Sequence, residues 1–265
     1  MGEMGDDYNI PVVLANADVP FLMVKRPKNP VVRIISLEGN IGAGKTSIAD
    51  YILQTYHEND NVVLINGQRV NIIVSKEPLN EFEKDVTDFY ENPQFGRGYL
   101  LQSKILVIRS RRTFHMLQEA ELMCKRTGLD TFVVIDRSLY GDEFFARTCF
   151  ELGHMDESEY STYNTIWQLM DEIINKKLSA VIYVNTNVEK CLERIKLRGR
   201  EMEKGIKTDY LDSLKSKHDA WLCDGQKSLG ETKLFIYTNP DMDAVTQKEA
   251  AWNQFVDVAT QCLQK

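Results

Sequence analysis

A glycine-rich segment at residues 39–46, Gly-Asn-Ile-Gly-Ala-Gly-Lys-Thr, constrains the fold more than any other part of the chain. It fits the pattern G-x-x-x-x-G-K-[ST] at every fixed position. An apolar, β-branched run at 31–37 precedes it, and apolar residues at helical spacing follow it at 48–53. A strand, a glycine loop and a helix in this order present backbone N–H groups to phosphate oxygens. The segment therefore predicts an α/β domain that binds a nucleoside triphosphate.

Individual residues of this loop have distinct roles in that interpretation. The glycines allow backbone conformations that other residues avoid, and they let the chain approach an anion closely. Lys45 brings a positive charge to the β- and γ-phosphates, and the hydroxyl of Thr46 suits Mg²⁺. The expected phosphate-binding residues are Gly39, Asn40, Ile41, Gly42, Ala43, Gly44, Lys45 and Thr46.

The remaining chain alternates strand-like runs with helical patterns. Further strands are predicted at 70–74, 131–135, 180–184 and 233–237. Helices are predicted at 81–90, 99–125, 142–152, 157–176, 187–197 and 207–223, before a last helix with an apolar face from Trp252 to Ala259. This alternation is typical of a parallel sheet, here of five strands, with helices on both faces.

The chain divides into an arm and one domain. Residues 1–30 precede the first strand, and their prolines oppose both a helix and a central strand. We expect an extended arm that packs either on its own domain or on a neighbouring subunit. Residues 31–265 contain no repeat or linker and are predicted to form a single domain.

Composition argues against several classes of partner. The formal net charge of −7 gives no sign of a nucleic-acid surface. No apolar run reaches transmembrane length, so membrane insertion is not expected. The five cysteines are scattered without a C-x-x-C pair, which predicts buried free thiols in a reducing compartment. The acidic start resembles no targeting signal, so we expect a cytoplasmic protein.

Charged residues follow the ends of three predicted strands, where ligands of such sheets bind. Glu38 directly precedes the glycine loop, and a carboxylate there would repel a triphosphate unless it had a task. Accepting the proton of a hydroxyl acceptor is such a task, and a surface glutamate is the alternative. Glu77 and Asp136 also stand at strand ends; Asp136 suits Mg²⁺, and Arg137 suits a transferred phosphoryl group. Asp142 opens the next predicted helix, where an N-cap is a common role.

Two further groups of polar residues have two interpretations each. Gln102 and Arg109 share one face of the predicted long helix, where either a nucleobase edge or a buried structural network would satisfy them. Three arginines fall within seven residues, and they would form either a lid over a triphosphate or a solvated loop. These arginines are Arg194, Arg198 and Arg200.

Taken together, these segments resemble the cellular deoxyribonucleoside kinases, which include deoxycytidine, deoxyguanosine, insect multisubstrate and bacterial deoxyadenosine kinases. The matching segments occur in the family's order between about residues 31 and 222; they are 35–45, 77–78, Gln102 with Arg109, 136–140 and 194–206. The resemblance implies a P-loop kinase fold with an arginine-rich lid. It also implies ATP- and Mg²⁺-dependent phosphorylation of the 5′-hydroxyl of deoxyribonucleosides, in the salvage of DNA precursors.

The resemblance assigns roles to individual residues. Glu38 and Arg137 are expected to be catalytic, Glu38 as the base that takes the 5′-hydroxyl proton. The expected metal residues are Thr46 and Asp136, and the ATP lid is Arg194, Arg198 and Arg200. The expected substrate-binding residues are Glu38, Phe82, Tyr90, Gln102, Arg109, Asp142, Phe145 and Glu203. Among these, Tyr90 and Glu203 would hold the 3′-hydroxyl and Gln102 would contact the base edge.

Three departures from the family pattern bear on the substrate. Phe82 stands where Trp is usual, Asp136 stands where many members have Glu, and the segment before Phe145 is one residue shorter than in the mammalian enzymes. The combination of Arg109 and Asp142 resembles members that accept purine nucleosides or deoxycytidine. The predicted order of preference is deoxyadenosine, deoxyguanosine, deoxycytidine and then thymidine.

Two other functions remain open from the sequence. A nucleoside monophosphate kinase on the same scaffold would need arginines and no base. A non-catalytic P-loop nucleotide-binding module is the second alternative, although the motifs D-x-x-G and [NT]-K-x-D are missing from the sequence. Since the family is typically dimeric, we expect a homo-oligomer that is at least a dimer. A tetramer would form through the N-terminal arm and the C-terminal end.

Overall fold

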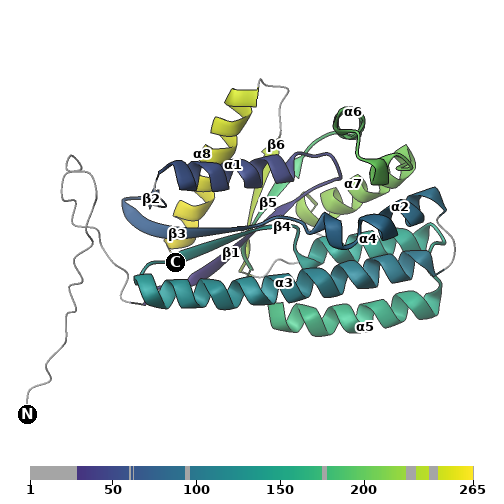
Figure 1. The fold of residues 1–265 in the computed structure, drawn as a ribbon, viewed down its shortest axis with the longest axis horizontal. Helices are drawn as coiled ribbons and strands as arrows, with labels where there is room; N and C mark the ends of the chain where they lie inside the picture. The colour runs from purple at the N-terminus through teal and green to yellow at the C-terminus, as the bar shows by residue number, and fades with distance from the viewer. Residues whose placement is uncertain are drawn as a thin grey trace, which may run out of the picture.

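A six-stranded sheet lies at the centre of the computed structural model (Figure 1). Residues 29–264 are described, except 60, 62, 93–95, 175–177, 225–230 and 239–243. The arm predicted at 1–30 therefore lies outside the described residues, apart from its last two positions. The strand order is β2-β3-β4-β1-β5-β6. The bounds are β1 (Val32–Glu38), β2 (Val63–Ile65), β3 (Gln68–Ser75), β4 (Thr131–Asp136), β5 (Leu178–Asn185) and β6 (Lys233–Thr238).

The five predicted strands form a parallel sheet, and β2 is an addition that the sequence analysis missed. β3, β4, β1, β5 and β6 pair in parallel, whereas β2 runs antiparallel to β3 at the sheet edge. The two are joined by Asn66 and Gly67, both at positive φ (51° and 74°). An Asn-Gly pair in this conformation is a strong hairpin signal. β2 is only three residues long, so its apolar pattern is too short to indicate a strand.

Eight α-helices among the described residues agree in order with the prediction. They are α1 (Lys45–Glu58), α2 (Glu83–Glu91), α3 (Arg97–Thr127), α4 (Leu139–Glu151), α5 (Glu157–Ile174), α6 (Val188–Arg198), α7 (Thr208–Leu222) and α8 (Ala244–Leu263). Two 3₁₀ turns, η1 (Leu79–Glu81) and η3 (Glu201–Glu203), precede α2 and α7. None of the described helices combines the length and apolar character needed to cross a bilayer.

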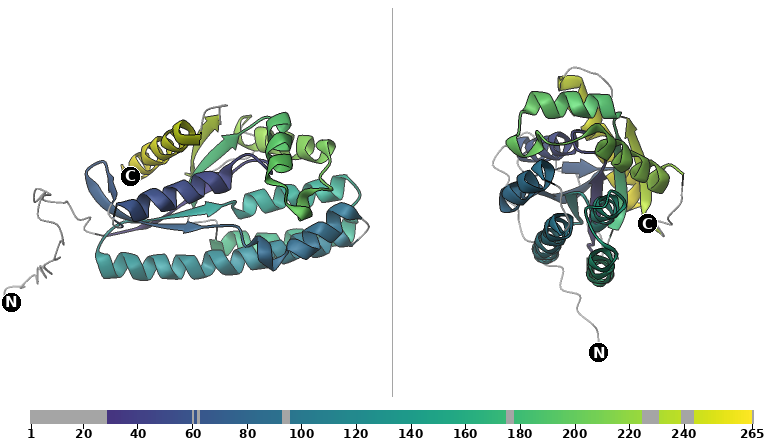
Figure 2. Two further views of the ribbon diagram at one scale, coloured as in Figure 1. Left: turned by 45° about the horizontal axis from the view of Figure 1, so that its top comes forward. Right: turned by 90° about the vertical axis from the view of Figure 1, so that its right-hand side faces the viewer.

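Alternate residues of each strand face opposite layers of helices. In β1, Ile35 and Leu37 face α1 and α8, whereas Ile34 faces α3, α4 and α7. Figure 2 shows α1 and α8 over one side of the sheet and α3 and α5 beneath the other. The predicted apolar face of the last helix is confirmed, because Phe255 and Ala259 are fully buried against α1 and the sheet.

Two smaller expectations are corrected. α4 begins at Leu139 with Ser138 at its N-cap position, so Asp142 lies inside the helix and does not cap it. All five cysteines are free, as predicted, but Cys223 is exposed at the end of α7. The earlier start of α4 brings Asp142 round to face α3, which matters for the site described below.

Burial of His218 predicts a specific dependence of stability on pH. His218 lies in α7, stacks on Tyr183, and shares a 2.7 Å hydrogen bond through Nδ1 with the carbonyl of Leu214. Burial, with a further contribution from the charge of Arg137, lowers the pKa of His218 to about 3. Between pH 6.5 and 3 the unfolded chain therefore binds a proton that the folded chain does not, and stability falls with falling pH by about 1.4 kcal/mol per pH unit.

We expect His218→Phe to remove the contribution of His218 to the pH dependence of the unfolding free energy. A phenyl ring can still stack on Tyr183, but it does not titrate. Urea unfolding at several pH values between 4 and 7 measures it for both proteins. Equal slopes for the two proteins would mean that other groups cause the acid sensitivity.

Candidate active site

A cavity of about 390 Å³ opens at the carboxyl ends of the parallel strands. Its walls come from the glycine loop, the segment from η1 to α2, α3, the residues after β4, and the arginine-rich segment 194–206. Most of the site residues predicted from the sequence line it: Ile41, Gly42, Gly44, Lys45, Thr46, Phe82, Tyr90, Gln102, Asp136, Arg137, Phe145, Arg194, Arg198, Arg200 and Glu203. The predicted residues outside its wall are Glu38, Gly39, Asn40, Ala43, Arg109 and Asp142. One cavity thus joins the predicted phosphate and nucleoside sites.

The glycine loop packs closely on the neighbouring backbone. Gly39 and Gly42 have φ values of 141° and 78°, and a Cβ on either would lie 2.6 Å from a carbonyl oxygen, of Val184 and Cys191 respectively. Lys45 Nζ donates to two carbonyls of the loop, at 2.8 and 3.1 Å. The loop therefore has the close-packed shape that a phosphate-binding loop requires, and the amino group of Lys45 lies against it.

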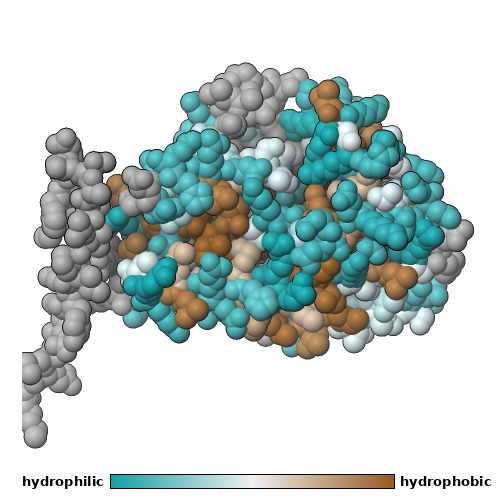
Figure 3. All heavy atoms as spheres, in the orientation of Figure 1, coloured by the Kyte–Doolittle hydropathy of each residue, from teal (hydrophilic) through white to brown (hydrophobic). Residues whose placement is uncertain are grey.

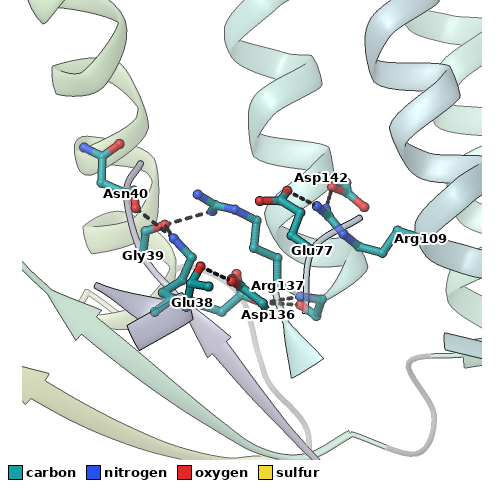
Figure 4. Close-up of polar contacts among 11 residues, drawn as sticks. Glu38, Gly39, Asn40, Glu77, Arg109, Asp136, Arg137 and Asp142 are labelled. Atoms are coloured by element: carbon teal, nitrogen blue, oxygen red, sulfur yellow. Dashed lines mark hydrogen bonds and ion pairs between the residues drawn. The ribbon is translucent and has the colours of Figure 1, made fainter. Parts of the chain in front are cut away.

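Three cationic side chains converge on this loop. Arg194 Nη1 donates to the carbonyl of Ala43 at 2.9 Å, and Arg137 Nη1 donates to the carbonyl of Gly39 at 2.8 Å. Together with Lys45 they form a concentrated positive charge beside the glycine loop. Figure 4 shows Arg137 reaching Gly39. Such a cluster suits a polyphosphate, because like charges this close repel unless an anion is shared among them.

The donor set of Thr46 and Asp136 fits a magnesium ion. Thr46 Oγ1 donates to Asp136 Oδ2 at 2.8 Å, and Asp136 Oδ1 is buried with no hydrogen-bond partner. Mg²⁺ is usually held by one or two protein oxygens together with water and phosphate oxygens. No cluster of three or more His, Cys, Asp or Glu side chains suited to a metal occurs in the described part of the chain. This is the sparse arrangement typical of a nucleotide-bound Mg²⁺.

Glu38, which the sequence analysis predicted as the general base, does not line the cavity. The side chain is completely buried, and its Oε1 accepts hydrogen bonds from Ser36 Oγ (2.6 Å), Ser138 N (2.7 Å) and Ser138 Oγ (2.6 Å). A Cβ placed on Gly141 would lie 2.8 Å from Glu38 Oε2, so the carboxylate rests against the first turn of α4. Its Oε2 is buried without a hydrogen-bond partner.

The carboxylate that does line the cavity is Glu77, between β3 and η1. Its side chain is 22% exposed, and its Oε1 accepts a 2.6 Å hydrogen bond from Arg109 Nη2. Arg109 is also paired with Asp142, so that it lies between two carboxylates (Figure 4). The sequence analysis placed Glu77 at a strand end but gave it no role.

Arg109, Asp142 and Glu77 form a buried network that orients Glu77. Burial lowers the pKa of Arg109, while the charge of Glu77 opposes this shift. Breaking a buried ion pair by removing one partner typically costs about 3–5 kcal/mol. Arg109 is therefore part of a buried ion-pair network, and of the two helix residues Gln102 reaches the cavity wall.

Arg137 adopts an unusual backbone conformation. Its φ of 71° lies in the left-handed region, which costs a non-glycine residue about 1–2 kcal/mol. Its guanidinium lies 4.5 Å from the centre of the Phe145 ring, within range of a cation–π contact. The conformation directs Arg137 from the end of β4 towards the glycine loop, and Phe145 contributes to the same wall.

Tyr90 and Glu203 also line the cavity. Arg198 donates to both carboxylate oxygens of Glu203 (2.7 and 3.1 Å), and Arg200 Nη1 lies 3.5 Å from Oε1. Two of the three predicted lid arginines therefore pair with Glu203, and Arg194 contacts the glycine loop. The ring of Tyr90 packs edge-on against Tyr210 at 5.8 Å between centroids, and burial raises the pKa of Tyr90.

The apolar part of the cavity includes residues that the sequence analysis missed. Gln102 Nε2 lies 3.9 Å from Cys149 Sγ, and Phe82 is almost fully buried. The additional apolar wall residues are Leu79, Val86, Leu101, Ile105, Met202 and Ile206. Ile105 shares the helical face of Gln102 and was detectable by spacing, whereas Met202 and Leu79 lie in 3₁₀ turns and had no periodic signal.

Comparisons with known proteins agree with this geometry. A sequence profile of the family described as deoxynucleoside kinase matches residues 35–262. Deoxycytidine kinase of Mus musculus is 31% identical over 205 residues, covering 72% of this chain and 75% of that protein. Deoxyadenosine kinase of Dictyostelium discoideum is 30% identical over 197 residues, covering 72% of this chain and 66% of that protein.

A solved structure of deoxyadenosine kinase from M. mycoides, with the products dCMP and dCDP bound, has the same fold. Its TM-score is 0.62 at 22% identity, covering 84% of this chain and 99% of that chain. The profile spans most of the chain, including the glycine loop and every described strand apart from the first three residues of β1. The chain therefore belongs to the deoxynucleoside kinase family and is a phosphotransferase that acts on deoxynucleosides.

Proposed function

We propose that this enzyme transfers the γ-phosphoryl group of ATP to the 5′-hydroxyl of a deoxynucleoside, with Glu77 as the general base. The observation that carries this proposal is that Glu77 and the glycine loop with Lys45 line one cavity. A carboxylate in such a position can accept the hydroxyl proton as the oxygen attacks the γ-phosphorus. The bond from the γ-phosphorus to the bridging oxygen then breaks, and ADP leaves. Arg109 holds Glu77 in place by its 2.6 Å hydrogen bond.

The remaining polar residues have supporting roles in this scheme. Lys45, Arg137 and Arg194 neutralise the negative charge of the triphosphate. Thr46 and Asp136 would hold Mg²⁺, which neutralises phosphate charge when bound. The free Asp136 Oδ1 supports this assignment. Tyr90 and Glu203 would bind the 3′-hydroxyl of the sugar, since both line the cavity.

Purine deoxynucleosides are the preferred substrates in our proposal, with deoxyadenosine first, then deoxyguanosine and deoxycytidine. Gln102 favours a base that carries an amino group next to a ring nitrogen. Its carboxamide oxygen can accept a hydrogen bond from the amino group, and its NH₂ group can donate to the ring nitrogen. Phe82 and Phe145 offer apolar surface for the flat base. Values of kcat/KM for the four deoxynucleosides test the order, and a dominant value for thymidine would overturn it.

The alternative of a nucleoside monophosphate kinase is tested by the acceptor. We expect ATP consumption with deoxyadenosine and very little with its 5′-monophosphate, because Glu77 repels an acceptor that is already a dianion. Faster turnover of the monophosphate would refute the proposed reaction. Nucleoside phosphorylation without ATP consumption would show that the donor is another triphosphate.

The low pKa of Lys45 predicts how ATP use depends on pH. Burial, aided by the charge of Arg137, lowers the pKa of Lys45 to about 8, although nearby carboxylates oppose the shift. Lys45 is charged below this pKa and neutral above it, so kcat/KM for ATP should fall as pH rises through about 8. In Lys45→Arg the side chain stays charged, and this fall should disappear even though activity is lower. An unchanged high-pH limb in the variant would assign it to another group.

We also propose a dimer formed through α3 and α5. Six exposed apolar residues lie on these two helices: Leu100, Val107, Phe114, Leu122, Leu169 and Ile173. Figure 3 shows apolar side chains along the edge of the molecule where α3 and α5 lie.

Light scattering of the full chain and of a variant lacking residues 1–25 distinguishes this dimer from a tetramer that forms through the N-terminal arm. A dimer mass for the truncated protein and a larger mass for the full chain are expected.

A further inference from the structure

We infer that Glu38 is a positioning residue for Arg137, which it holds through the hydrogen bonds that it accepts from Ser138. This inference rests on the proposed function, since Arg137 contributes to phosphoryl transfer only if the reaction occurs in this cavity. It assigns a task to a buried carboxylate that does not line the cavity. The argument depends on the backbone between β4 and α4, where Asp136, Arg137 and Ser138 follow one another.

This turn is unfavourable by itself. Arg137 has a φ of 71°, and the other described non-glycine residues at positive φ are Asn61 and Asn66. Asparagine tolerates the left-handed region because its short side chain can hydrogen-bond locally, whereas arginine has no such compensation. A conformation of this kind persists only where the surrounding structure fixes it. The contacts on both sides of Arg137 are therefore informative.

Glu38 fixes the residue that follows Arg137. Its Oε1 accepts both the backbone N–H of Ser138 at 2.7 Å and the hydroxyl of Ser138 at 2.6 Å. On the preceding side, the N–H of Arg137 itself donates to the carbonyl of Leu37 at 3.1 Å. Two successive N–H groups of the turn are thus bound to two successive residues of β1, and the left-handed conformation is held from both sides.

A carboxylate is better suited to this position than a neutral group. Ser138 is at the N-cap position of α4, where the helix dipole favours a negative charge. Burial lowers the pKa values of Lys45 and Arg109, and the charge of Glu38 opposes this lowering and so favours the charged forms. Hydrogen bonds to an ionised acceptor are roughly twice as strong as neutral ones. Glu38 thus anchors the turn and balances the positive charge beside the loop.

The orientation of Arg137 depends on this turn. From the left-handed backbone its side chain reaches the carbonyl of Gly39 at 2.8 Å and packs on the Phe145 ring at 4.5 Å. If the turn relaxed to an ordinary conformation, the Cα–Cβ bond would point in another direction and the guanidinium would leave the phosphate site. Replacement of Glu38 should therefore lower kcat, because Arg137 would be displaced from the phosphate site.

A double-mutant cycle between Glu38 and Arg137 tests the inference. We expect Glu38→Gln to lower kcat by roughly tenfold or more, with the KM for deoxyadenosine changed less than threefold. In the Arg137→Ala background the same substitution should change kcat by less than about twofold, because the residue on which it acts is gone. If Glu38→Gln lowered kcat by the same factor in the wild-type and Arg137→Ala backgrounds, the inference would be overturned. Loss of the acidic limb of the pH profile in Glu38→Gln would also overturn it, since that result identifies Glu38 as the base.

A matched pair of serine variants keeps the inference testable if Glu38→Gln does not fold. Ser36→Ala and Ser138→Ala each remove one hydroxyl that donates to Glu38 Oε1 at 2.6 Å. Both should lower Tm by similar amounts, but Ser138→Ala alone should lower kcat, because Ser36 lies in β1 and not in the turn. Equal kcat values for the two variants would refute a positioning role. A wild-type enzyme without deoxynucleoside kinase activity would instead refute the proposed function.

Discussion

Glu77→Gln is expected to lower kcat for deoxyadenosine by about 10²- to 10⁴-fold, the usual contribution of a general base. Glutamine has nearly the same shape and still accepts the hydrogen bond from Arg109, but it cannot take a proton from the 5′-hydroxyl. The KM for ATP should change little, since Glu77 stands on the acceptor side of the proposed reaction. Steady-state assays with varied ATP and varied nucleoside measure these parameters separately.

The matched control is Glu81→Gln, the same substitution four residues further along the chain. Glu81 pairs with Arg111 and Arg112 outside the active-site cavity, and its side chain is 31% exposed. Surface pairs of this kind contribute about 0–1 kcal/mol, so activity and stability should both stay near wild type. If Glu77→Gln were as active as Glu81→Gln, the proton would have to leave by another route, and Glu77 would be only a binding residue.

The choice between Glu38 and Glu77 shows what the sequence could predict and what it could not. Both residues were placed at strand ends from the apolar runs before them, and both placements are correct. The direction of each side chain depends on the pleat of the strand, which the pattern also contains. Ile35 and Leu37 face α1, so Ser36 and Glu38 must face the opposite layer, where α4 lies. The prediction of Glu38 as the base came from its proximity to the loop, whereas the structure places its side chain outside the cavity wall.

Other features depended on contacts between segments far apart in the chain. The parallel strands and the long helices had strong periodic patterns and were predicted to within a few residues. The pairing of Arg109 with both Glu77 and Asp142 joins three segments, and no spacing within one segment reveals it. Arg198 and Glu203 are only five residues apart, but their pairing depends on the 3₁₀ turn η3, which contains Glu203 and has no periodic signal. Sequence patterns thus predicted which residues gather at the sheet edge but not how they pair.

Gly42→Ala is expected to raise the KM for ATP by on the order of 10- to 100-fold, because the phosphate loop would have to move. The added Cβ would lie 2.6 Å from the carbonyl oxygen of Cys191 and 3.1 Å from Ile195 Cγ1. That carbonyl belongs to the backbone of α6, so it cannot rotate away as a flexible side chain could. Displacing the loop misdirects N–H groups that bind phosphate, and each hydrogen bond to a charged group contributes about 1.5–3 kcal/mol.

Gly128→Ala separates this effect from simple backbone strain. Gly128 has a similar φ of 66° at the end of α3, but a Cβ there would meet nothing within 4 Å. The variant should lose about 1–2 kcal/mol of stability from the left-handed conformation and keep the wild-type KM for ATP. Thermal unfolding and ATP titration of both variants measure the two effects independently. Equal KM values would show that the loop tolerates a methyl group, and the close packing against α6 would then have no part in binding ATP.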